Sequence, residues 1–228
     1  MKTDLDILYE DEQLVAIHKP NGLLVHRTKI AGDATEFALQ LLRDQIGQKV
    51  FPTHRLDRKT SGVLLFAKDD ETNRLMQIQF MDQKVEKGYL AIVRGWINDE
   101  GTVDVPLTND AGKTQDAVTN YRMLMRSEID LAYGKFETSR YSLAEVRPTT
   151  GRMHQIRKHF AHLRHPIIGD RPHGCNKQNK LFKDEFAMTT MLLHAEKVSF
   201  NHPITNASVR ILAPIKDEFK RMLVELKL

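Results

Sequence analysis

The chain has 228 residues, of which 41% are hydrophobic, so it is long enough and apolar enough to bury a substantial core. It carries 34 Lys and Arg against 30 Asp and Glu, a net charge of +4, which permits a polyanionic partner without requiring one. The single cysteine excludes an intrachain disulfide and a site built of several thiolates. We find no signal-peptide pattern and no long apolar run, and therefore expect a cytoplasmic protein without a membrane span.

Short apolar, β-branched runs predict six strands. They lie at 14–20, 61–68, 89–97, 141–148, 192–200 and 208–214. Asn21 and Gly22 follow the first run and are typical of a two-residue turn, so we expect a hairpin there. Because strands come both consecutively and in alternation with helices, the order favours an α+β fold with a mixed sheet.

Apolar residues at helical spacing predict four amphipathic helices. They lie around 37–42, 75–85, 153–163 and 219–226. We expect Asp70 to cap the second helix, Gly88 to break the chain after it, and Pro166 to stop the third. The segments 108–117 and 126–140 are interpreted as excursions from one domain.

One acid in the segment 51–68 lies in an unusual cationic setting. The segment reads FPTHRLDRKTSGVLLFAK and places Asp57 among His54, Arg55, Arg58 and Lys59, just before an apolar strand. A turn at TSG would hold the carboxylate on a rigid loop at a sheet edge. Neighbouring guanidinium groups would lower its pKa and keep it ionised, which suits a nucleophile or base. A structural Asp–Arg pair that fixes a loop explains the same pattern equally well.

The segment 147–170 predicts a strongly basic helix. It reads RPTTGRMHQIRKHFAHLRHPIIGD, and its polar faces carry Arg152, Arg157 and Lys158. Such a helix can bind phosphates, and one arginine can reach a carboxylate such as Asp57, while a merely solvated basic face remains the alternative. Histidines recur here, but only His159 and His162 have ligand spacing, and no HExxH or paired CxxC completes a shell, so we expect no metal.

Five segments, in this order, resemble the RluA-type pseudouridine synthases. They read HKPNGLLVH, HRLDRKTSGVLLFAK, KGYLAIVRG, TGRMHQIRKHFAHLRHPIIGD and MLLHA, and the resemblance covers roughly 7–214. RDQIGQKVFPTHRLDRKTSGVLL and HFAHLRHPIIGDRPHGCNKQN are more similar still to the members that modify uridine 65 of transfer RNA. The resemblance implies a single catalytic domain over 1–228, with a mostly antiparallel mixed sheet flanked by helices and loops, and no S4-like RNA-binding domain.

The resemblance also implies the site. Asp57 matches the catalytic aspartate, Arg157 the arginine that pairs with it, and Tyr89 the tyrosine that stacks on the target base. Arg55 matches an arginine that enters the RNA helix when the uridine flips out, and Leu193 matches an apolar pocket residue, with Leu192 as the neighbour in an alternative register. Met153 replaces a threonine that is common at its position.

Four further cations complete the expected RNA-binding set. They are Arg58, Lys59, Arg152 and Lys158, which we expect to contact phosphates. Lys19 lies near this surface in our interpretation, although turn chemistry alone explains it. We therefore expect a monomeric isomerase that acts on RNA, in particular tRNA, and that needs no membrane, metal or organic cofactor. Ribosomal RNA as the substrate, a non-catalytic RNA-binding or chaperone protein, and a zinc hydrolase are the alternatives.

Overall fold

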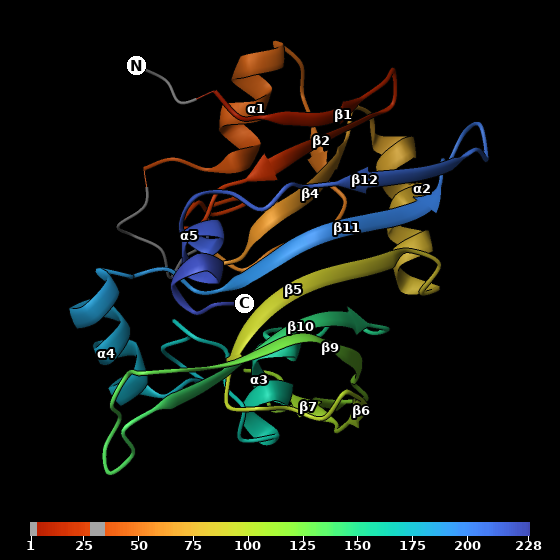
Figure 1. The fold of residues 1–228 in the computed structure, drawn as a ribbon. Coiled ribbons are helices and arrows are strands. Elements are labelled where there is room, and N and C mark those ends of the chain that lie inside the picture. Colours follow the sequence, from red (N-terminus) through yellow and green to blue (C-terminus); the bar gives the residue numbers. More distant parts are fainter. Residues whose placement is uncertain (1–3, 28–34) are drawn as a thin grey trace. The chain divides into compact units, whose positions relative to one another are not determined.

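The computed structural model describes residues 4–27 and 35–228 (Figure 1). The chain divides into two compact units: the first unit is Met1–Lys87 with Ala195–Pro214, and the second unit is Gly88–His194 with Ile215–Leu228. No helix among the described residues is long and apolar enough to cross a membrane. The helices and strands of each unit follow.

The first unit is built on a sheet with the strand order β1-β2-β4-β11, in which β12 pairs with β11 and β3 with β4. Its strands are β1 (Ile7–Glu10), β2 (Leu14–Lys19), β3 (Phe51–Pro52), β4 (Ser61–Ala67), β11 (Leu193–Asn201) and β12 (Ser208–Leu212). The pairs β1–β2, β2–β4, β3–β4 and β11–β12 are antiparallel. Every residue of β2 is buried, which explains its nearly continuous apolar sequence.

Two helices belong to the first unit, α1 (Ala38–Ile46) and α2 (Asp70–Met81). Gly47 ends α1 in the left-handed conformation, with φ of 65°, and its N–H donates to the carbonyl of Arg43. Met76 of α2 is fully buried in a cluster with Leu14, Val63 and other side chains of one sheet face. The amphipathic pattern of α2 therefore places this helix on the sheet.

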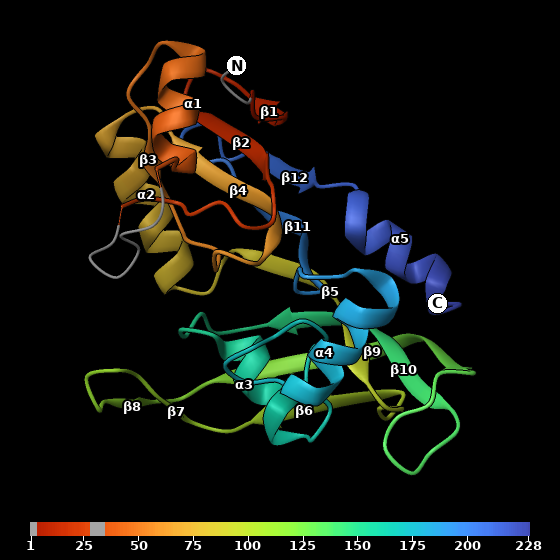
Figure 2. The same cartoon turned by 90° about the vertical axis from the view of Figure 1, so that its left-hand side faces the viewer.

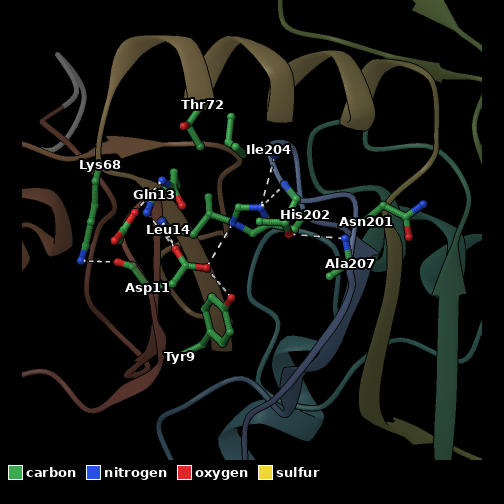
Figure 3. A network of polar contacts seen from close by, with 12 residues as sticks. Tyr9, Asp11, Gln13, Leu14, Lys68, Thr72, Asn201, His202, Ile204 and Ala207 are labelled. Carbon is green, nitrogen blue, oxygen red and sulfur yellow. Dashed lines mark hydrogen bonds and ion pairs between the residues drawn. The ribbon is translucent and has the colours of Figure 1, made fainter.

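A polar network joins the β1–β2 turn to the β11–β12 turn in the first unit (Figure 3). The hydroxyl of Tyr9 donates to Asp11, whose other oxygen accepts the N–H groups of Gln13 and Leu14. Burial and the Asp11 carboxylate raise the pKa of Tyr9 to about 12. His202 accepts the N–H groups of Ile204 and Thr205 through Nδ1, so its proton is on Nε2, 3.1 Å from Asp11 Oδ2. The two turns are thus fixed to each other by one carboxylate.

The second unit contains a sheet with the strand order β5-β10-β9-β6 and a separate β7–β8 hairpin, which extends away from those strands (Figure 2). Its strands are β5 (Glu86–Arg94), β6 (Glu100–Asp104), β7 (Leu107–Thr108), β8 (Thr114–Gln115), β9 (Val118–Ile129) and β10 (Ser139–Pro148). Its helices are α3 (Gln155–His162), α4 (Asn176–Phe186) and α5 (Asp217–Glu225). The pairs β5–β10, β9–β10 and β6–β9 are antiparallel.

Alternation along β10 divides the core of the second unit between the two faces of this sheet. Ala144 and Val146 are buried in a cluster with α3 residues, among them Phe160. Tyr141 and Leu143 are buried in a second cluster, which contains apolar residues of α4 and α5. The sheet therefore supports α3 on one face and α4 with α5 on the other.

The expected α+β class is confirmed, as a mixed set of strands and helices, and all six expected strands are present within a few residues. The hairpin expected at Asn21–Gly22 is wrong. Gly22 has φ of 88°, so the turn itself forms, but its N–H donates to the carbonyl of Arg58, and Leu24, two residues further along, forms a β-bridge with Phe37. The turn packs on another loop instead of joining two paired strands.

Two expected helix boundaries are also wrong. The N-cap of α2 is Asp69, not Asp70, because the Asp69 carboxylate accepts the N–H of Thr72 at 2.7 Å. Gly88 lies inside β5, and the helix has already ended at Asp82. The third helix begins at Gln155, after His154 in the left-handed conformation, and ends before Pro166 as expected. The described chain also contains β9 and α4, which the sequence did not indicate.

The cap yields a stability prediction. Asp69→Ala should lower the free energy of unfolding by about 1 kcal/mol, because the Thr72 N–H loses its acceptor. Asp70→Ala removes the same charge from the same helix turn and should change it by less than about 0.5 kcal/mol, since Asp70 does not cap. Urea unfolding of both variants measures the difference, and equal losses would contradict the assignment of the cap.

Candidate active site

Asp57 lies on a tight turn of the first unit, immediately before β4. Its backbone carbonyl accepts the N–H of Thr60, and its side chain is half-buried. Ser61 and Gly62 of the TSG sequence already belong to β4, so the turn lies at 57–60, earlier in the chain than expected. Gly62 has φ of 111°, and a Cβ there would lie 2.1 Å from the carbonyl oxygen of Ala195 in β11. Close approach of β11 thus explains the glycine that follows the turn.

The 19–22 segment holds the Asp57 turn through its backbone. The N–H of Gly22 donates to the carbonyl of Arg58 at 2.8 Å, and Nε of Arg58 donates back to the carbonyl of Gly22 at 3.1 Å. The side-chain amide of Asn21 donates to the carbonyl of Lys59. These bonds connect two loops that are more than thirty residues apart in the sequence and limit the positions that the Asp57 turn can take.

Lys19 is the buried centre of this arrangement. Its side chain is fully buried, and Nζ donates to the carbonyls of Pro20 at 2.9 Å, Leu23 at 2.8 Å and Arg58 at 3.1 Å. An ammonium group has three donors, and here each has a carbonyl acceptor. Burial lowers the pKa of Lys19 to about 7, while the charge of Asp57 acts to raise it. Lys19, which turn chemistry alone can explain in the sequence, is therefore a structural and electrostatic neighbour of Asp57.

His54 is a neutral packing residue. Its Nε2 accepts the N–H of Leu65 at 3.1 Å, and its ring lies 5.0 Å from that of Phe80, measured between centroids. Burial, together with the charge of Lys87, lowers the pKa of His54 to about 4. His54 therefore adds no positive charge around Asp57 at neutral pH.

The other cations of this segment differ in exposure. Arg55 and Arg58 are exposed and Lys59 is half-buried, while Leu56 between them packs inward. Arg58 has its Nε engaged with Gly22, as described above. Arg55 therefore offers the more accessible guanidinium group beside the turn, and its expected role in base flipping stays a prediction.

In the second unit, Tyr89 and Leu193 pack on the same apolar cluster. Tyr89 is half-buried on β5, opposite Val146 of β10, and Leu193 is 3% exposed at the start of β11. Both belong to the cluster beneath α3, whereas Leu192 belongs to the cluster on the opposite face. This placement favours Leu193 over Leu192 as the apolar neighbour of Tyr89.

Arg157 is buried and forms a two-point ion pair with Asp170. Its Nε lies 2.8 Å from Asp170 Oδ2 and its Nη2 lies 2.8 Å from Oδ1, and the two residues are 7% and 1% exposed. Such a paired geometry fixes the plane of the guanidinium group. The sequence indicated Arg157 but assigned no role to Asp170. The expected pairing of Arg157 with Asp57 stays a prediction.

Gln155 fixes the start of α3. Its carbonyl oxygen accepts the hydroxyl of Thr150 and the N–H of Arg152, and its amide donates to Val118 and Thr119. The sequence does not indicate a role for Gln155, because its burial cannot be told from the pattern of polar residues on this basic helix. Its four bonds anchor the turn before Arg157 to β9.

Arg152 and Lys158 are half-buried, and each donates to a backbone carbonyl of the β7–β8 region. Arg152 Nε lies 2.9 Å from the carbonyl of Asp116, and Lys158 Nζ lies 3.1 Å from that of Thr108. Both cations thus hold the hairpin through one donor each. Their expected phosphate contacts stay a prediction.

The histidines of this segment form protein contacts. His159 lies between the hydroxyl of Thr119 and the carbonyl of Val105, and burial lowers its pKa. His154 Nδ1 lies 2.9 Å from His173 Nε2. Across 4–27 and 35–228, no three His, Cys, Asp or Glu side chains gather in a way that could hold a metal ion.

The buried Lys19 predicts a pH-dependent difference in stability. Between pH 7 and about pH 10, the unfolded chain keeps the Lys19 proton and the folded chain has lost it, so the free energy of unfolding rises with pH. Relative to Lys19→Met, the wild type should gain up to about 1.4 kcal/mol per pH unit in this range, and nothing from this group below it. Urea unfolding at several pH values measures this, with exposed Lys84→Met as the matched control. A pH-independent difference would contradict the assignment.

Comparison with known proteins identifies the family. The family described as RNA pseudouridylate synthase matches residues 13–162. The chain is 48% identical to tRNA pseudouridine synthase C of Vibrio parahaemolyticus, over 96% of this chain and 94% of that protein. It is 46% identical to tRNA pseudouridine synthase C of Vibrio cholerae, over 97% and 95%.

A solved structure gives the same result for the fold. Human RNA pseudouridylate synthase domain containing 4 has a TM-score of 0.75 and 26% sequence identity, and the match covers 97% of this chain and 93% of that one. The matched family region includes Asp57, Tyr89 and Arg157. The chain therefore belongs to the RNA pseudouridylate synthase family and is an isomerase.

Proposed function

We propose that this protein is a tRNA pseudouridine synthase that converts uridine 65 to pseudouridine, with Asp57 as the catalytic carboxylate. The observation that carries the proposal is the turn of Asp57, whose backbone is bound by the fully buried Lys19 and by the Gly22 turn. The substrate class is supported by relatives named tRNA pseudouridine synthase C, which match nearly the whole chain. Position 65 is supported by the resemblance of the two segments around Asp57 and after α3.

The reaction sets the requirements that these residues would meet. The N1–C1′ bond of uridine breaks, the detached base turns over, C5 bonds to C1′, and C5 loses the proton while N1 gains one. Asp57 can attack C1′, add to C6 or abstract the C2′ proton, and each route needs an ionised carboxylate in a fixed place. By the family resemblance, Arg157 keeps that carboxylate charged and oriented.

Tyr89 and Leu193 would retain the free base during its rotation. Tyr89 offers a half-buried ring and a hydroxyl, and Leu193 offers an apolar surface on the same cluster. Exclusion of water from such a surface strengthens every polar contact at the reacting atoms. Arg55, exposed beside Asp57, would occupy the space that the flipped uridine leaves and offset part of the few kcal/mol of unstacking.

Asp57→Asn should abolish pseudouridine formation and leave the Kd for tRNA within about tenfold, because it removes the reacting carboxylate but no cation. Asp70→Asn, a matched change at an exposed acid of the same unit, should keep full activity. Release of tritium from [5-³H]uridine-labelled tRNA measures the reaction, and filter binding measures the affinity. Full activity of Asp57→Asn would contradict the proposed role.

The target is tested by mapping pseudouridine in total tRNA with carbodiimide and primer extension. Cells without the gene should lack the modification at position 65, and the wild-type gene should restore it whereas Asp57→Asn should not. The wild-type gene supplies the positive control within the same experiment. An unchanged tRNA map with a lost ribosomal RNA modification would replace the proposed substrate with ribosomal RNA.

A further inference from the structure

A hollow in the second unit lies outside the residues assigned so far. It lies beside α4, between the loop after α3 and the 188–190 segment, and has a volume of about 210 Å³. This is several times the roughly 30 Å³ that one water molecule takes in the liquid. Its lining includes the buried Met188 and residues of α4, a helix that Figure 2 labels. The space is large enough for a ligand group with several heavy atoms.

The charged side chains around this hollow are all cationic. They are Arg171, Lys180 and Lys183, each exposed, and no Asp or Glu is in the lining. Among the residues that the structure describes, none of these three side chains forms an ion pair. Three cations around one concave surface repel each other unless an anion neutralises them, so the hollow favours an anionic ligand.

Neutral hydrogen-bonding groups complete the lining. Asn176, Asn179, Thr189 and Thr190 are among the lining residues. The hydroxyl oxygen of Thr190 is buried and has no hydrogen-bond partner within the described structure. A buried hydroxyl without a partner is unfavourable, and a ligand oxygen in the hollow would supply the missing acceptor.

The hollow is connected to the Arg157–Asp170 pair through Asn179. Its side-chain amide donates to the carbonyl of Asp170 at 2.7 Å, and its carbonyl oxygen accepts the N–H of Gly169 at 2.9 Å. Gly169 has φ of 82°, and a Cβ there would lie 1.8 Å from the carbonyl oxygen of Thr190. One wall of the hollow is therefore the backbone that positions Asp170.

We propose that this hollow binds phosphate groups of the substrate RNA backbone, with Lys180, Lys183 and Arg171 as the charged contacts and the Thr190 hydroxyl as a donor. Three cations with neutral donors and no acid match a phosphodiester, which is singly charged and acceptor-rich. The proposal rests on the proposed function, because it takes RNA as the substrate. Occupancy of the site would also hold the Gly169–Asp170 backbone, and with it the guanidinium group of Arg157.

The test compares a triple variant, Arg171→Ala with Lys180→Ala and Lys183→Ala, with the wild type. Because each lost phosphate contact lowers the slope of log Kobs against log salt by about 0.7–0.9, the triple variant should lose about 2 from that slope and bind tRNA at least about tenfold more weakly. Lys177→Ala removes an exposed lysine from the same helix, outside the hollow, and should change the slope by less than about 0.3. Thermal unfolding verifies that the triple variant keeps the wild-type fold.

A second arm separates the RNA backbone from free phosphate. Calorimetric titration with inorganic phosphate should show weak binding to the wild type that competes with tRNA and is absent from the triple variant. Loss of phosphate binding with unchanged tRNA affinity would assign the site to a free anion and overturn the proposal, as would equal tRNA affinity and salt slope in wild type and triple variant. If the three single-site changes were to disturb folding, Lys183→Glu alone should still weaken tRNA binding more than Lys177→Glu.

Failure of this inference is distinguishable from failure of the proposed function. A wild type that forms pseudouridine in tRNA, with a triple variant that binds tRNA normally, would contradict the phosphate site alone. A wild type that binds tRNA but forms no pseudouridine in it would contradict the proposed function, and the binding comparison would still decide the phosphate site.

Discussion

The arrangement of the candidate site depends first on one buried ammonium group. Lys19 donates to the carbonyls of Pro20, Leu23 and Arg58 from a fully buried position, and thereby joins the end of β2 to the turn that carries Asp57. Burial still disfavours this charge and lowers the pKa of Lys19 to about 7, although each donor has a carbonyl partner and the charge of Asp57 acts against the shift. The three hydrogen bonds of Lys19 hold the turn in one conformation, which is what the role proposed for Asp57 requires.

In the second unit a buried carboxylate, not a buried ammonium group, fixes a neighbouring side chain. There the buried carboxylate of Asp170 orients the guanidinium group of Arg157 through two parallel bonds. Asp170 is in turn held by its backbone, through the Asn179 side chain and a glycine that no other residue can replace without a clash. Each unit thus contains a buried ionic group whose hydrogen bonds fix a neighbouring segment or side chain. Buried ion pairs in general contribute little net stability.

Much of this could be predicted from the sequence where the signal is local. The apolar runs predict the strands at 14–20 and 61–68. The TSG sequence at the start of the second run predicts the turn that carries Asp57. What failed depends on contacts distant in the chain. The Asn21–Gly22 turn has the residues of a hairpin turn, but its partner is the 57–60 turn. The sequence does not indicate β9 because a bulge between Met123 and Met125 breaks its alternation, and the apolar side chains of Leu124 and Met125 are both exposed. The sequence does not predict the burial of Lys19, because this burial results from tertiary contacts and the spacing of neighbouring residues does not indicate it.

The cations fall into two groups, those that form hydrogen bonds within the protein and those that are exposed and form no ion pair in the described chain. Lys19, Arg157, Arg152 and Lys158 donate to carbonyls or to Asp170, so at least part of their hydrogen-bonding capacity is used within the protein. Arg55 and the three cations around the α4 hollow are exposed and form no ion pair in the described chain. A modest net charge of +4 is therefore a poor guide to RNA affinity, because affinity depends on the cations that are free to release counterions on binding. In this protein the exposed cations without an ion pair in the described chain include Arg55 beside Asp57 in the first unit and the three around the α4 hollow in the second.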